Sequence, residues 1–365
     1  MKARIILVGG FLGAGKTSLL FEAASKLTKN GKRVGLITND QAPELVDTTF
    51  LEYTKGVIRE VSGSCFCCNY EGFTDAIFHL MKEQQADIIF AEPVGSCTDL
   101  SATILQPLKK HFGKDFAIAP LTVLVDPKRL SDILDGVKSG LHPSAVYIIR
   151  KQIEEADIIA ISKTDLLTSH EVEELKMRAA KEWPNSMVLA ISSKTGEGMD
   201  KWLNEVTSRA DAGSKLAEVD YDIYAEGEAV LGWLNATLEL KGDSIDWDRF
   251  AGNLLNTLSR RFDDSNSVVG HVKLIIQAGD NFVIGNLTGN NESISIRRSA
   301  GIANEAKMTL NARVQMEPEN LEKIVLEEVS NVCGTNIISE ILALRCLSPG
   351  RPKPTHHYDY VVEMQ

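Results

Sequence analysis

The sequence predicts an α/β fold with a mostly parallel sheet, followed by a smaller α+β domain. In the first half of the chain, short runs of branched apolar residues alternate with amphipathic stretches. This alternation is typical of βαβ units, in which helices cover a parallel sheet. The second half instead has an alternating run, a helical pattern and two further runs joined by a turn. That second pattern predicts antiparallel strands with helices.

Each expected strand of the first half is a short run of mainly Val, Ile and Leu bounded by polar residues. These strands are expected at Arg4–Val8, Arg33–Thr38, Val57–Val61, Asp87–Ala91, Leu121–Val125, Asp157–Ile161 and Met187–Ile191. Amphipathic spacing predicts helices between most of them. The clearest helices are Thr17–Lys29, Phe73–Gln84 and Ser169–Trp183.

The second half is expected to form its own domain. The expected elements are a strand at Ala229–Leu240, a helix at Trp247–Phe262, strands at Ser267–Gln277 and Phe282–Leu287, and a helix at 317–329 with Pro318 in its first turn. Residues 210–219 are expected to connect the halves, and the tail after Leu347 contains three prolines in a polar stretch. We therefore expect domains at 1–212 and 220–347, and a flexible tail at 348–365.

Composition and charge limit the classes of partner. The chain has 365 residues, of which 44% are hydrophobic and 24% are charged, values typical of globular domains. Its formal charge is −11, and an acidic surface is unsuited to nucleic acid because Lys and Arg supply most of the affinity for phosphates. The apolar runs are shorter than the ~20 residues that a bilayer needs, and residues 5–8 are too few for a signal peptide core. We expect a cytoplasmic protein that binds neither nucleic acid nor membrane.

Residues 10–17, GFLGAGKT, match the pattern G-x-x-x-x-G-K-[ST]. The motif follows an expected strand and opens an expected helix, where a glycine-rich loop can cradle phosphates with its backbone N–H groups. An accidental glycine-rich turn is the weaker alternative. Lys16 is expected to contact the β and γ phosphates, and Thr17 to hold Mg²⁺. The expected nucleotide cradle comprises Gly13, Ala14, Gly15, Lys16, Thr17 and Ser18.

Two later motifs favour GTP over ATP. Residues 161–165, ISKTD, resemble the N-K-x-D guanine motif of P-loop GTPases, with Ser162 where Asn is usual. The Asp165 carboxylate would accept hydrogen bonds from the N1–H and 2-amino groups of guanine, which adenine cannot offer together. Lys163 would lie along the base. Residues 192–196, SSKTG, resemble the last GTPase motif, and backbone N–H groups there, including that of Ser193, would meet the guanine oxygen.

An acidic strand end is a candidate nucleotide switch. Residues 87–95, DIIFAEPVG, place Glu92 at the end of an expected strand and Gly95 three residues later. Glu92 is expected to orient a water on Mg²⁺, and the Gly95 N–H to sense the γ-phosphate. The alternative is that Glu92 only caps the strand end.

Cys65, Cys67 and Cys68 occur together in the run SGSCFCC, between an expected strand and an expected helix. Thiolates favour Zn²⁺, Cu⁺ or a similar ion. On a straight strand Cys65 and Cys67 share a face, and a turn at Cys68 would bring in a third sulfur. Three ligands leave a fourth position open, which suits metal transfer more than scaffolding. Buried apolar cysteines and a redox dithiol stay open as alternatives.

Further cysteines and histidines give weaker signals. Cys97 follows the candidate switch and could approach it, although packing is the simpler interpretation. Cys333 and Cys346 lie in helical, apolar contexts and are expected in the core. His356 and His357 lie in the proline-rich tail, where a solvated segment is favoured over a metal role.

Taken in order, GGFLGAGKTSLL, C-x-C-C, E-x-x-G and K-x-D resemble the CobW group of GTPases, which is related to the nickel-insertion GTPases of hydrogenase and urease. The resemblance covers about residues 3–205 and implies a P-loop NTPase domain that binds Mg²⁺·GTP and uses nucleotide state to load or release a metal. Asn39 and Asp40 match the family's Asn-Glu, so the resemblance implies that Asp40 is a switch acid, with Asp47 as a second candidate. Lys16, Glu92 and Asp40 are the expected catalytic residues, and no residue is assigned to position the attacking water.

The resemblance implies a GTP-hydrolysing metallochaperone that delivers Zn²⁺ or Co²⁺ to a client, either a metalloprotein or a corrinoid-system protein of cobalamin metabolism. The alternative is a GTP-dependent activation or assembly factor whose cysteines are structural. A small-molecule kinase ranks last, because no arginine cluster follows the switch region. A homodimer stays open, since such GTPases often pair through their nucleotide faces.

Overall fold

A computed structural model describes residues 2–40, 45–54, 56–136, 140–290 and 294–363. The chain forms two compact units. Unit 1 comprises Met1–Gln41, Leu51–Gly227 and Arg351–Gln365, and unit 2 comprises Ala42–Phe50 and Glu228–Gly350. The C-terminal segment therefore belongs to unit 1, although the whole of unit 2 lies before it in the sequence.

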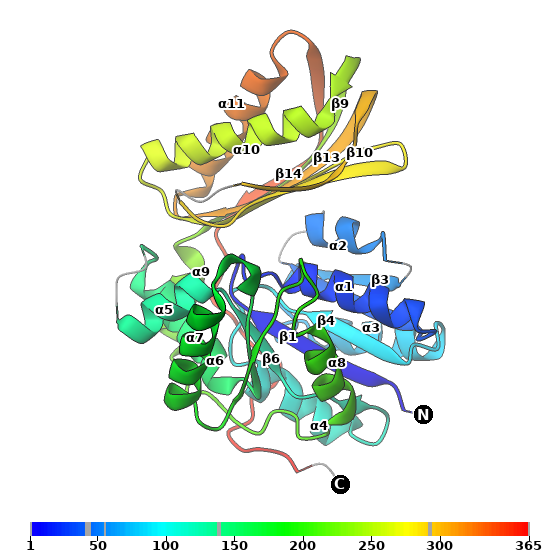
Figure 1. The fold of residues 1–365 in the computed structure, drawn as a ribbon, viewed down its shortest axis with the longest axis vertical. Helices are drawn as coiled ribbons and strands as arrows, with labels where there is room; N and C mark the ends of the chain where they lie inside the picture. Colours follow the sequence, from blue (N-terminus) through cyan, green and yellow to red (C-terminus); the bar gives the residue numbers. More distant parts are fainter. Residues whose placement is uncertain (1, 41–44, 55, 137–139, 291–293, 364–365) are drawn as a thin grey trace. The chain divides into compact units, whose positions relative to one another are not determined.

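Unit 1 is an α/β unit built on one eight-stranded sheet (Figure 1). Its strand order is β3-β2-β4-β1-β6-β7-β8, with β5 beside β1, and all the pairs are parallel. The strands are β1 (Arg4–Gly10), β2 (Val34–Asp40), β3 (Val57–Ser62), β4 (Ile88–Glu92), β5 (Ala117–Ile118), β6 (Thr122–Val125), β7 (Ile158–Ile161) and β8 (Met187–Ala190). The expected parallel sheet is confirmed, and each strand expected in this half forms to within a few residues.

Helices follow these strands along the chain. They are α1 (Lys16–Lys29), α2 (Val46–Leu51), α3 (Tyr70–Lys82), a π-helical turn η1 (Ser101–Leu105) that continues into α4 (Gln106–Phe112), α5 (Pro127–Asp135), α6 (Pro143–Glu155), a 3₁₀ turn η2 (Thr164–Leu166), α7 (Ser169–Glu182), α8 (Met199–Ser208) and α9 (Tyr221–Ala229). Most of α2 belongs to unit 2. The chain moves from β1 to β2 in one direction along the sheet, and from β4 to β8 in the other. Right-handed crossovers of opposite direction place their helices on opposite faces, so unit 1 is a doubly wound sheet.

The strand order sets where a ligand can bind. β1 and β4 are neighbours, and β2 pairs with the other side of β4. Because these strands are parallel, the segments that follow them emerge at the same edge of the sheet. Ligands of doubly wound folds bind at this carboxyl edge, near the point where the strand order reverses.

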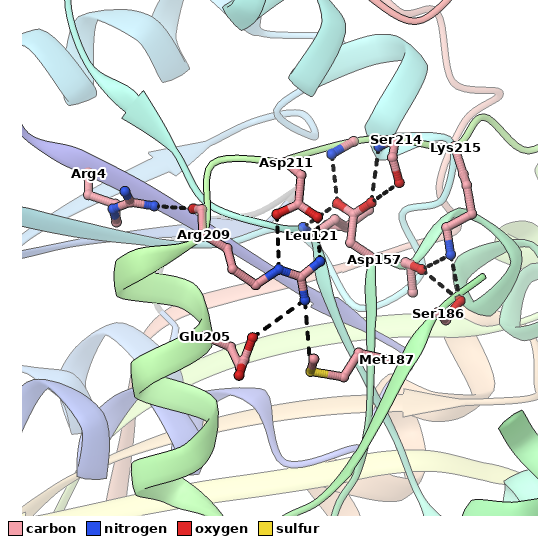
Figure 2. Close-up of polar contacts among 12 residues, drawn as sticks. Arg4, Leu121, Asp157, Ser186, Met187, Glu205, Arg209, Asp211, Ser214 and Lys215 are labelled. Carbon is pink, nitrogen blue, oxygen red and sulfur yellow. Dashed lines mark hydrogen bonds and ion pairs between the residues drawn. The ribbon is translucent and has the colours of Figure 1, made fainter. Parts of the chain in front are cut away.

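The expected connection after α8 is bonded firmly to unit 1 (Figure 2). The buried carboxylate of Asp157 accepts hydrogen bonds from the Gly213 N–H (2.6 Å), the Ser214 N–H (3.0 Å) and the Leu121 N–H (2.7 Å). Arg4 donates to the Arg209 carbonyl at 2.6 Å. These charge-assisted contacts fix the chain against the sheet before it reaches unit 2.

Unit 2 is a six-stranded antiparallel sheet in the order β12-β11-β10-β13-β9-β14. Its elements are β9 (Gly232–Asp246), α10 (Trp247–Asp264), β10 (Val269–Ala278), β11 (Asn281–Leu287), β12 (Ser295–Ser299), β13 (Ile302–Val314), α11 (Pro318–Cys333) and β14 (Ile337–Leu347). Helices α10 and α11 pack together on the sheet and cover one face of it (Figure 1). The expected smaller α+β domain is confirmed, although β12, β13 and β14 were not expected.

The helical context expected for Cys346 is wrong, because Cys346 lies in β14. The run from Ile337 to Leu347 is mostly apolar but includes Ser339, Glu340 and Arg345 without a regular alternation, so its periodicity could not separate strand from helix. Pairing with β9 decided the outcome. Cys333 does end a helix and is buried, as expected.

Part of the segment before Leu51 is bonded to the sheet of unit 2. The Val46 N–H donates to Asn311 at 2.8 Å, and the Lys273 ammonium contacts both carboxylate oxygens of Asp47, at 2.7 and 2.8 Å. Asp47, the second switch candidate, is therefore ion-paired within unit 2. Among the described residues, no helix is both long and apolar enough to cross a membrane.

Candidate nucleotide and metal site

The glycine-rich loop lies between β1 and α1, as the motif predicts. Gly10 has φ of 128°, and a Cβ there would lie 2.2 Å from the Leu124 carbonyl oxygen. Gly15, with φ of 95°, precedes the first residue of α1. Because glycine has no side chain to cap the helix, the first N–H groups of α1 stay available for an anion.

The side chains expected to serve Mg²⁺ and the γ-phosphate converge beside this loop. The Thr17 hydroxyl donates to Glu92 at 3.0 Å. The Lys16 ammonium donates to the Gly10 carbonyl at 2.8 Å and lies 3.9 Å from Glu92. All three side chains are buried, so their charges interact in a medium less polar than water.

The two candidate switch segments also end at this edge. Asp40 is the last residue of β2 and is buried. A Cβ on Gly95 would lie 2.7 Å from a Leu12 methyl carbon and 3.1 Å from the Lys16 ammonium. Gly95 therefore lies directly against the glycine-rich loop, where the sequence places its γ-phosphate sensor.

The expected guanine motifs come together after β7 and β8. The Ser192 hydroxyl donates to Asp165 at 2.7 Å, and the Lys194 ammonium lies 3.7 Å from the other oxygen of Asp165. Ser193 follows in the same turn. Lys163 is ion-paired with Asp126 at 2.9 Å. The structure thus brings the K-x-D and SSKTG motifs into contact.

Sequence reasoning missed two charged residues of this edge, both at the start of α5. Burial acts to raise the pKa of Asp126, but the nearby cations Lys163 and Arg129 outweigh it and hold that pKa below its ordinary value. Arg129 donates to the Leu12 carbonyl at 2.8 Å and stacks 5.1 Å from the Phe11 ring centroid. The available signal was the Asp-Pro pair at 126–127, which is typical of a helix start.

The three clustered cysteines converge as expected, but on a turn. The Cys65 sulfur lies 3.0 Å from Cys67 and 3.1 Å from Cys68, and the last two sulfurs are 3.8 Å apart. The expectation of a straight strand is wrong, because the Cys68 and Asn69 N–H groups both donate to the Cys65 carbonyl. This turn leads into α3, so all three sulfurs reach one point. Among the described residues, these are the one group of three ligand side chains close enough to share an ion.

The cysteine turn is tied to β2 by one amide side chain. Asn39 donates to the carbonyls of Val61 (2.7 Å) and Ser64 (2.8 Å), and accepts from the Phe66 N–H at 2.9 Å. An amide can satisfy donor and acceptor groups at once. Asn39 therefore holds the turn to the strand whose next residue is Asp40.

Hydrogen bonds among the three thiols favour ionisation of Cys65 over the other two. Hydrogen bonds from Cys67 and Cys68 hold the pKa of Cys65 well below its ordinary value. The hydrogen bond between Cys67 and Cys65 raises the pKa of Cys67. The hydrogen bond between Cys68 and Cys65 raises the pKa of Cys68 to about 11. A thiolate held by neighbouring thiols is a preformed soft ligand, and a bound cation would take the place of their protons.

The C-terminal segment lies against the cysteine turn. The Thr355 N–H donates to the Cys67 carbonyl at 2.8 Å, and the Lys353 N–H to the Cys68 sulfur at 3.2 Å. His356 packs edge-on against Tyr70. Residues 348–363 form no helix or strand, but the proline-rich composition gave no sign of these contacts.

The family model described as CobW/HypB/UreG, nucleotide-binding domain, matches residues 4–189. The chain is 26% identical over 181 residues to Zinc chaperone YjiA of Escherichia coli (48% of this chain, 54% of the relative). It is 25% identical over 226 residues to Zinc chaperone CobW of Pseudomonas aeruginosa (53% and 57%). It is 27% identical over 179 residues to Zinc-regulated GTPase metalloprotein activator 1 of Schizosaccharomyces pombe (45% and 40%). The chain thus spans about half the length of the curated relatives it matches.

Some solved structures share a partial likeness with this chain. One is the Zn(II)-bound YjiA GTPase of E. coli (16% identity, 90% of this chain and 99% of that chain, TM-score 0.37). Another is HypB of Helicobacter pylori in complex with nickel (16% identity, 60% and 91%, TM-score 0.41). At TM-scores below 0.5, these likenesses support no functional conclusion.

Proposed function

This chain belongs to the CobW/HypB/UreG family by its nucleotide-binding domain, and from that premise we propose that it is a GTP-hydrolysing metallochaperone. Nucleotide state would control the binding of Zn²⁺ and its delivery to a client. The observation that carries the proposal is the cysteine turn, where three sulfurs lie 3.0 to 3.8 Å apart. A tetrahedral zinc–thiolate site with bonds of about 2.3 Å has sulfur–sulfur edges of about 3.8 Å. The sulfurs therefore need only small shifts to hold the ion.

The residues at the carboxyl edge fit a magnesium–nucleotide complex. Thr17 and Glu92 offer oxygens to Mg²⁺, which prefers hard oxygen ligands. The ion would neutralise charge that develops on the phosphates. Lys16 and the N-terminus of α1 would bind the phosphate chain, with Gly95 against the γ-phosphate.

The base would be read by the second group of residues. Asp165 would accept from guanine N1–H and the 2-amino group, Lys163 would lie along the ring, and the Ser193 N–H would meet the guanine oxygen. Lys16, Glu92 and Asp40 are the proposed catalytic residues. Asn39 of β2 is hydrogen-bonded to the cysteine turn, and Asp40 is the next residue of the same strand. A change at Asp40 can therefore reach the thiols through one strand end.

Zinc is proposed ahead of cobalt, because thiolates suit Zn²⁺ and two of the matched relatives are named zinc chaperones. Co²⁺ and a corrinoid-system client of cobalamin metabolism remain the alternative cargo and destination. A cytoplasmic site of action is proposed because a reducing compartment keeps thiol ligands available. The client is proposed to be a metalloprotein, and a homodimer is one form in which the chain could act.

The test is a titration of Zn²⁺ and Co²⁺ into metal-free protein with Mg²⁺·GTP, with Mg²⁺·GDP and without nucleotide. Metal affinity that differs between the two nucleotides supports gated delivery. Binding that is absent, or that ignores the nucleotide, would instead favour the GTP-dependent assembly factor with structural cysteines.

A pair of cysteine variants makes the titration specific. Cys65→Ala removes the sulfur that contacts both others, and is expected to weaken zinc binding by at least about tenfold while GTP binding stays unchanged. Cys346→Ala, in β14 of unit 2, is the matched control and should change neither. Intact zinc binding in Cys65→Ala would overturn the proposed metal site.

A further inference from the structure

A fourth cysteine reaches the cluster from a different part of the chain. Cys97 follows β4 and its side chain is 1% exposed. Its thiol is hydrogen-bonded to Cys65, the sulfur at the centre of the triad. Cys97 is separated from the cysteine turn by the whole of α3 and β4, so this contact is made by the fold.

The loop that carries Cys97 also touches the phosphate end of the site. Gly95 lies against Leu12 and Lys16 of the glycine-rich loop. The Cys97 N–H donates to the Val94 carbonyl at 2.9 Å, which closes a tight turn over these residues. One end of this short turn therefore faces the expected γ-phosphate, and the other end faces the thiols.

Helix α6 supports the turn with two buried side chains. The Gln152 amide donates to the carbonyls of Gly95 (3.1 Å) and Cys97 (2.7 Å). One helical turn later, Glu155 accepts from the Ser101 N–H at 2.7 Å. The Gln152 amide thus holds both Gly95 and Cys97, so a displacement of one residue is mechanically linked to a displacement of the other.

The geometry of the triad leaves a place for this sulfur. Three thiolates occupy one face of a tetrahedron, and a closed zinc site needs a fourth ligand. No histidine or carboxylate among the described residues joins the group of ligand atoms. Cys97 lies outside this group of three as well, but its thiol is hydrogen-bonded to Cys65, and sulfur is the ligand type that the other three supply.

We infer that Cys97 is the fourth sulfur ligand of the transported metal, and that its loop links the metal to the γ-phosphate. The inference rests on the proposed function and extends it. With Cys97 bound, the site is a closed four-sulfur site. With the Gly95–Cys97 turn displaced, it is a three-sulfur site with an open position, where a client's ligand can attack.

The ligation step is balanced as a proton-for-metal exchange. The Cys97 S–H bond breaks, its electron pair forms the sulfur–metal bond, and the proton passes to solvent. The reverse step returns a proton from solvent to Cys97 when the metal leaves. No oxidant or reductant takes part.

The test counts sulfurs around the metal. X-ray absorption at the zinc edge is recorded on the full chain loaded with Zn²⁺, for wild type, Cys97→Ser, Cys97→Ala and Cys333→Ala. Wild type and the Cys333 control are expected to show about four sulfurs per zinc, and both Cys97 variants about three with a lighter atom added. With Co²⁺ in place of zinc, the sulfur-to-cobalt charge-transfer absorbance of the Cys97 variants should fall by about a quarter.

A second readout tests the link to the nucleotide. Zinc affinity is measured with Mg²⁺ and a non-hydrolysable GTP analogue, and again with Mg²⁺·GDP. Cys97→Ser is expected to weaken zinc binding at least about tenfold in the nucleotide state that favours the closed site. It should bring the affinities in the two states closer together. The isosteric serine keeps the turn packed, so agreement between Ser and Ala variants separates ligation from packing.

Two outcomes would contradict the inference, in different ways. If wild type binds zinc with three sulfurs and the Cys97 variants match it in sulfur count and affinity, Cys97 is a packed thiol and the proposed function still stands. If wild type binds no zinc under any nucleotide, the proposed function itself is overturned, and the ligand role with it.

Discussion

The phosphate end of the site and its cysteine end are built in different ways. At the phosphate end, the Lys16 ammonium donates to a carbonyl only six residues earlier, within one continuous motif. At the cysteine end, the Cys68 sulfur accepts from the Lys353 N–H, 285 residues later in the chain. One end is a local structure, whereas the other is closed by segments that only the complete fold brings together.

This difference has a consequence for how each end can fail. A local motif keeps its geometry as long as β1 and α1 form, since its contacts are short in sequence. The cysteine end depends on Asn39 from β2, on the loop after β4 and on the C-terminal segment. Loss of any one of these contacts should therefore alter the metal site.

The largest effect is expected at the local end. Lys16→Ala removes the ammonium that would bind the β and γ phosphates, and should lower GTP hydrolysis by at least about a hundredfold. Zinc binding without nucleotide should stay unchanged, because the sulfurs are elsewhere. Phosphate release from GTP measures the first effect, and Lys29→Ala, at the exposed end of α1, is the control. A Lys16→Ala protein that hydrolyses GTP at the wild-type rate would contradict the role of Lys16 in phosphate binding.

A smaller effect is expected where the base would bind. Asp165→Asn replaces one acceptor by a donor, so affinity for GTP should fall by about 10- to 100-fold. Affinity for xanthosine triphosphate should rise, because that base carries an oxygen where guanine has its 2-amino group. Competition binding with both nucleotides checks the reversal, with Asp200→Asn in α8 as control. Unchanged preference for GTP would show that Asp165 does not read the base.

The third effect concerns pH and the support behind the Cys97 loop. Burial raises the pKa of Glu155 to about 8, and the nearby Asp99 adds to the rise. The folded chain therefore holds a proton that the unfolded chain releases above its ordinary pKa of about 4.5. As a result, the unfolding free energy falls as pH rises from about 4.5 to about 8.

Glu155→Gln mimics the protonated carboxyl and should remove this pH dependence. From pH 6 to pH 8, wild type is expected to lose about 2 kcal/mol of unfolding free energy relative to the variant. Urea unfolding at the two pH values measures the difference. Glu154→Gln, at the neighbouring position, should behave as wild type. A constant difference between wild type and Glu155→Gln at both pH values would contradict the buried neutral acid.

The smallest effect is expected at the C-terminal segment. Lys353→Pro removes the N–H that donates to the Cys68 sulfur at 3.2 Å. A single lost hydrogen bond should weaken zinc binding about fivefold. Lys353→Ala keeps the N–H and serves as the matched control. Zinc affinity is measured by competition titration. Equal affinities in the two variants would show that the C-terminal segment does not support the metal site.

The first half of the chain was open to prediction because its elements repeat a simple pattern. The run from Arg4 to Gly10 followed by GAGKT specifies strand, loop and helix by local preferences alone. Strand β14 was not predictable in this way, since its sequence IISEILALRCL mixes apolar and polar residues without a clear period. Its pairing with β9 decides its conformation.

The residues of the candidate site also fall into two groups, those that motifs identify and those that only the fold brings to the site. Lys16, Thr17, Glu92 and Asp165 could be named from motifs, because phosphate and guanine binding need fixed residue types at fixed spacing. Asp126 and Arg129 could not, because the start of α5 carries no such spacing, and they meet the site only through Lys163 and Leu12.

The sequence by itself determined the glycine-rich loop and the three clustered thiols, since each depends on residues within a few positions of one another, and it indicated the parallel sheet through the repeated alternation of strand and helix patterns. Only the tertiary structure decided that Cys97 contacts Cys65 and that the C-terminal segment lies on the cysteine turn. The physical reason is chain connectivity: a contact between distant segments follows from the packing of every element between them. No local preference encodes it.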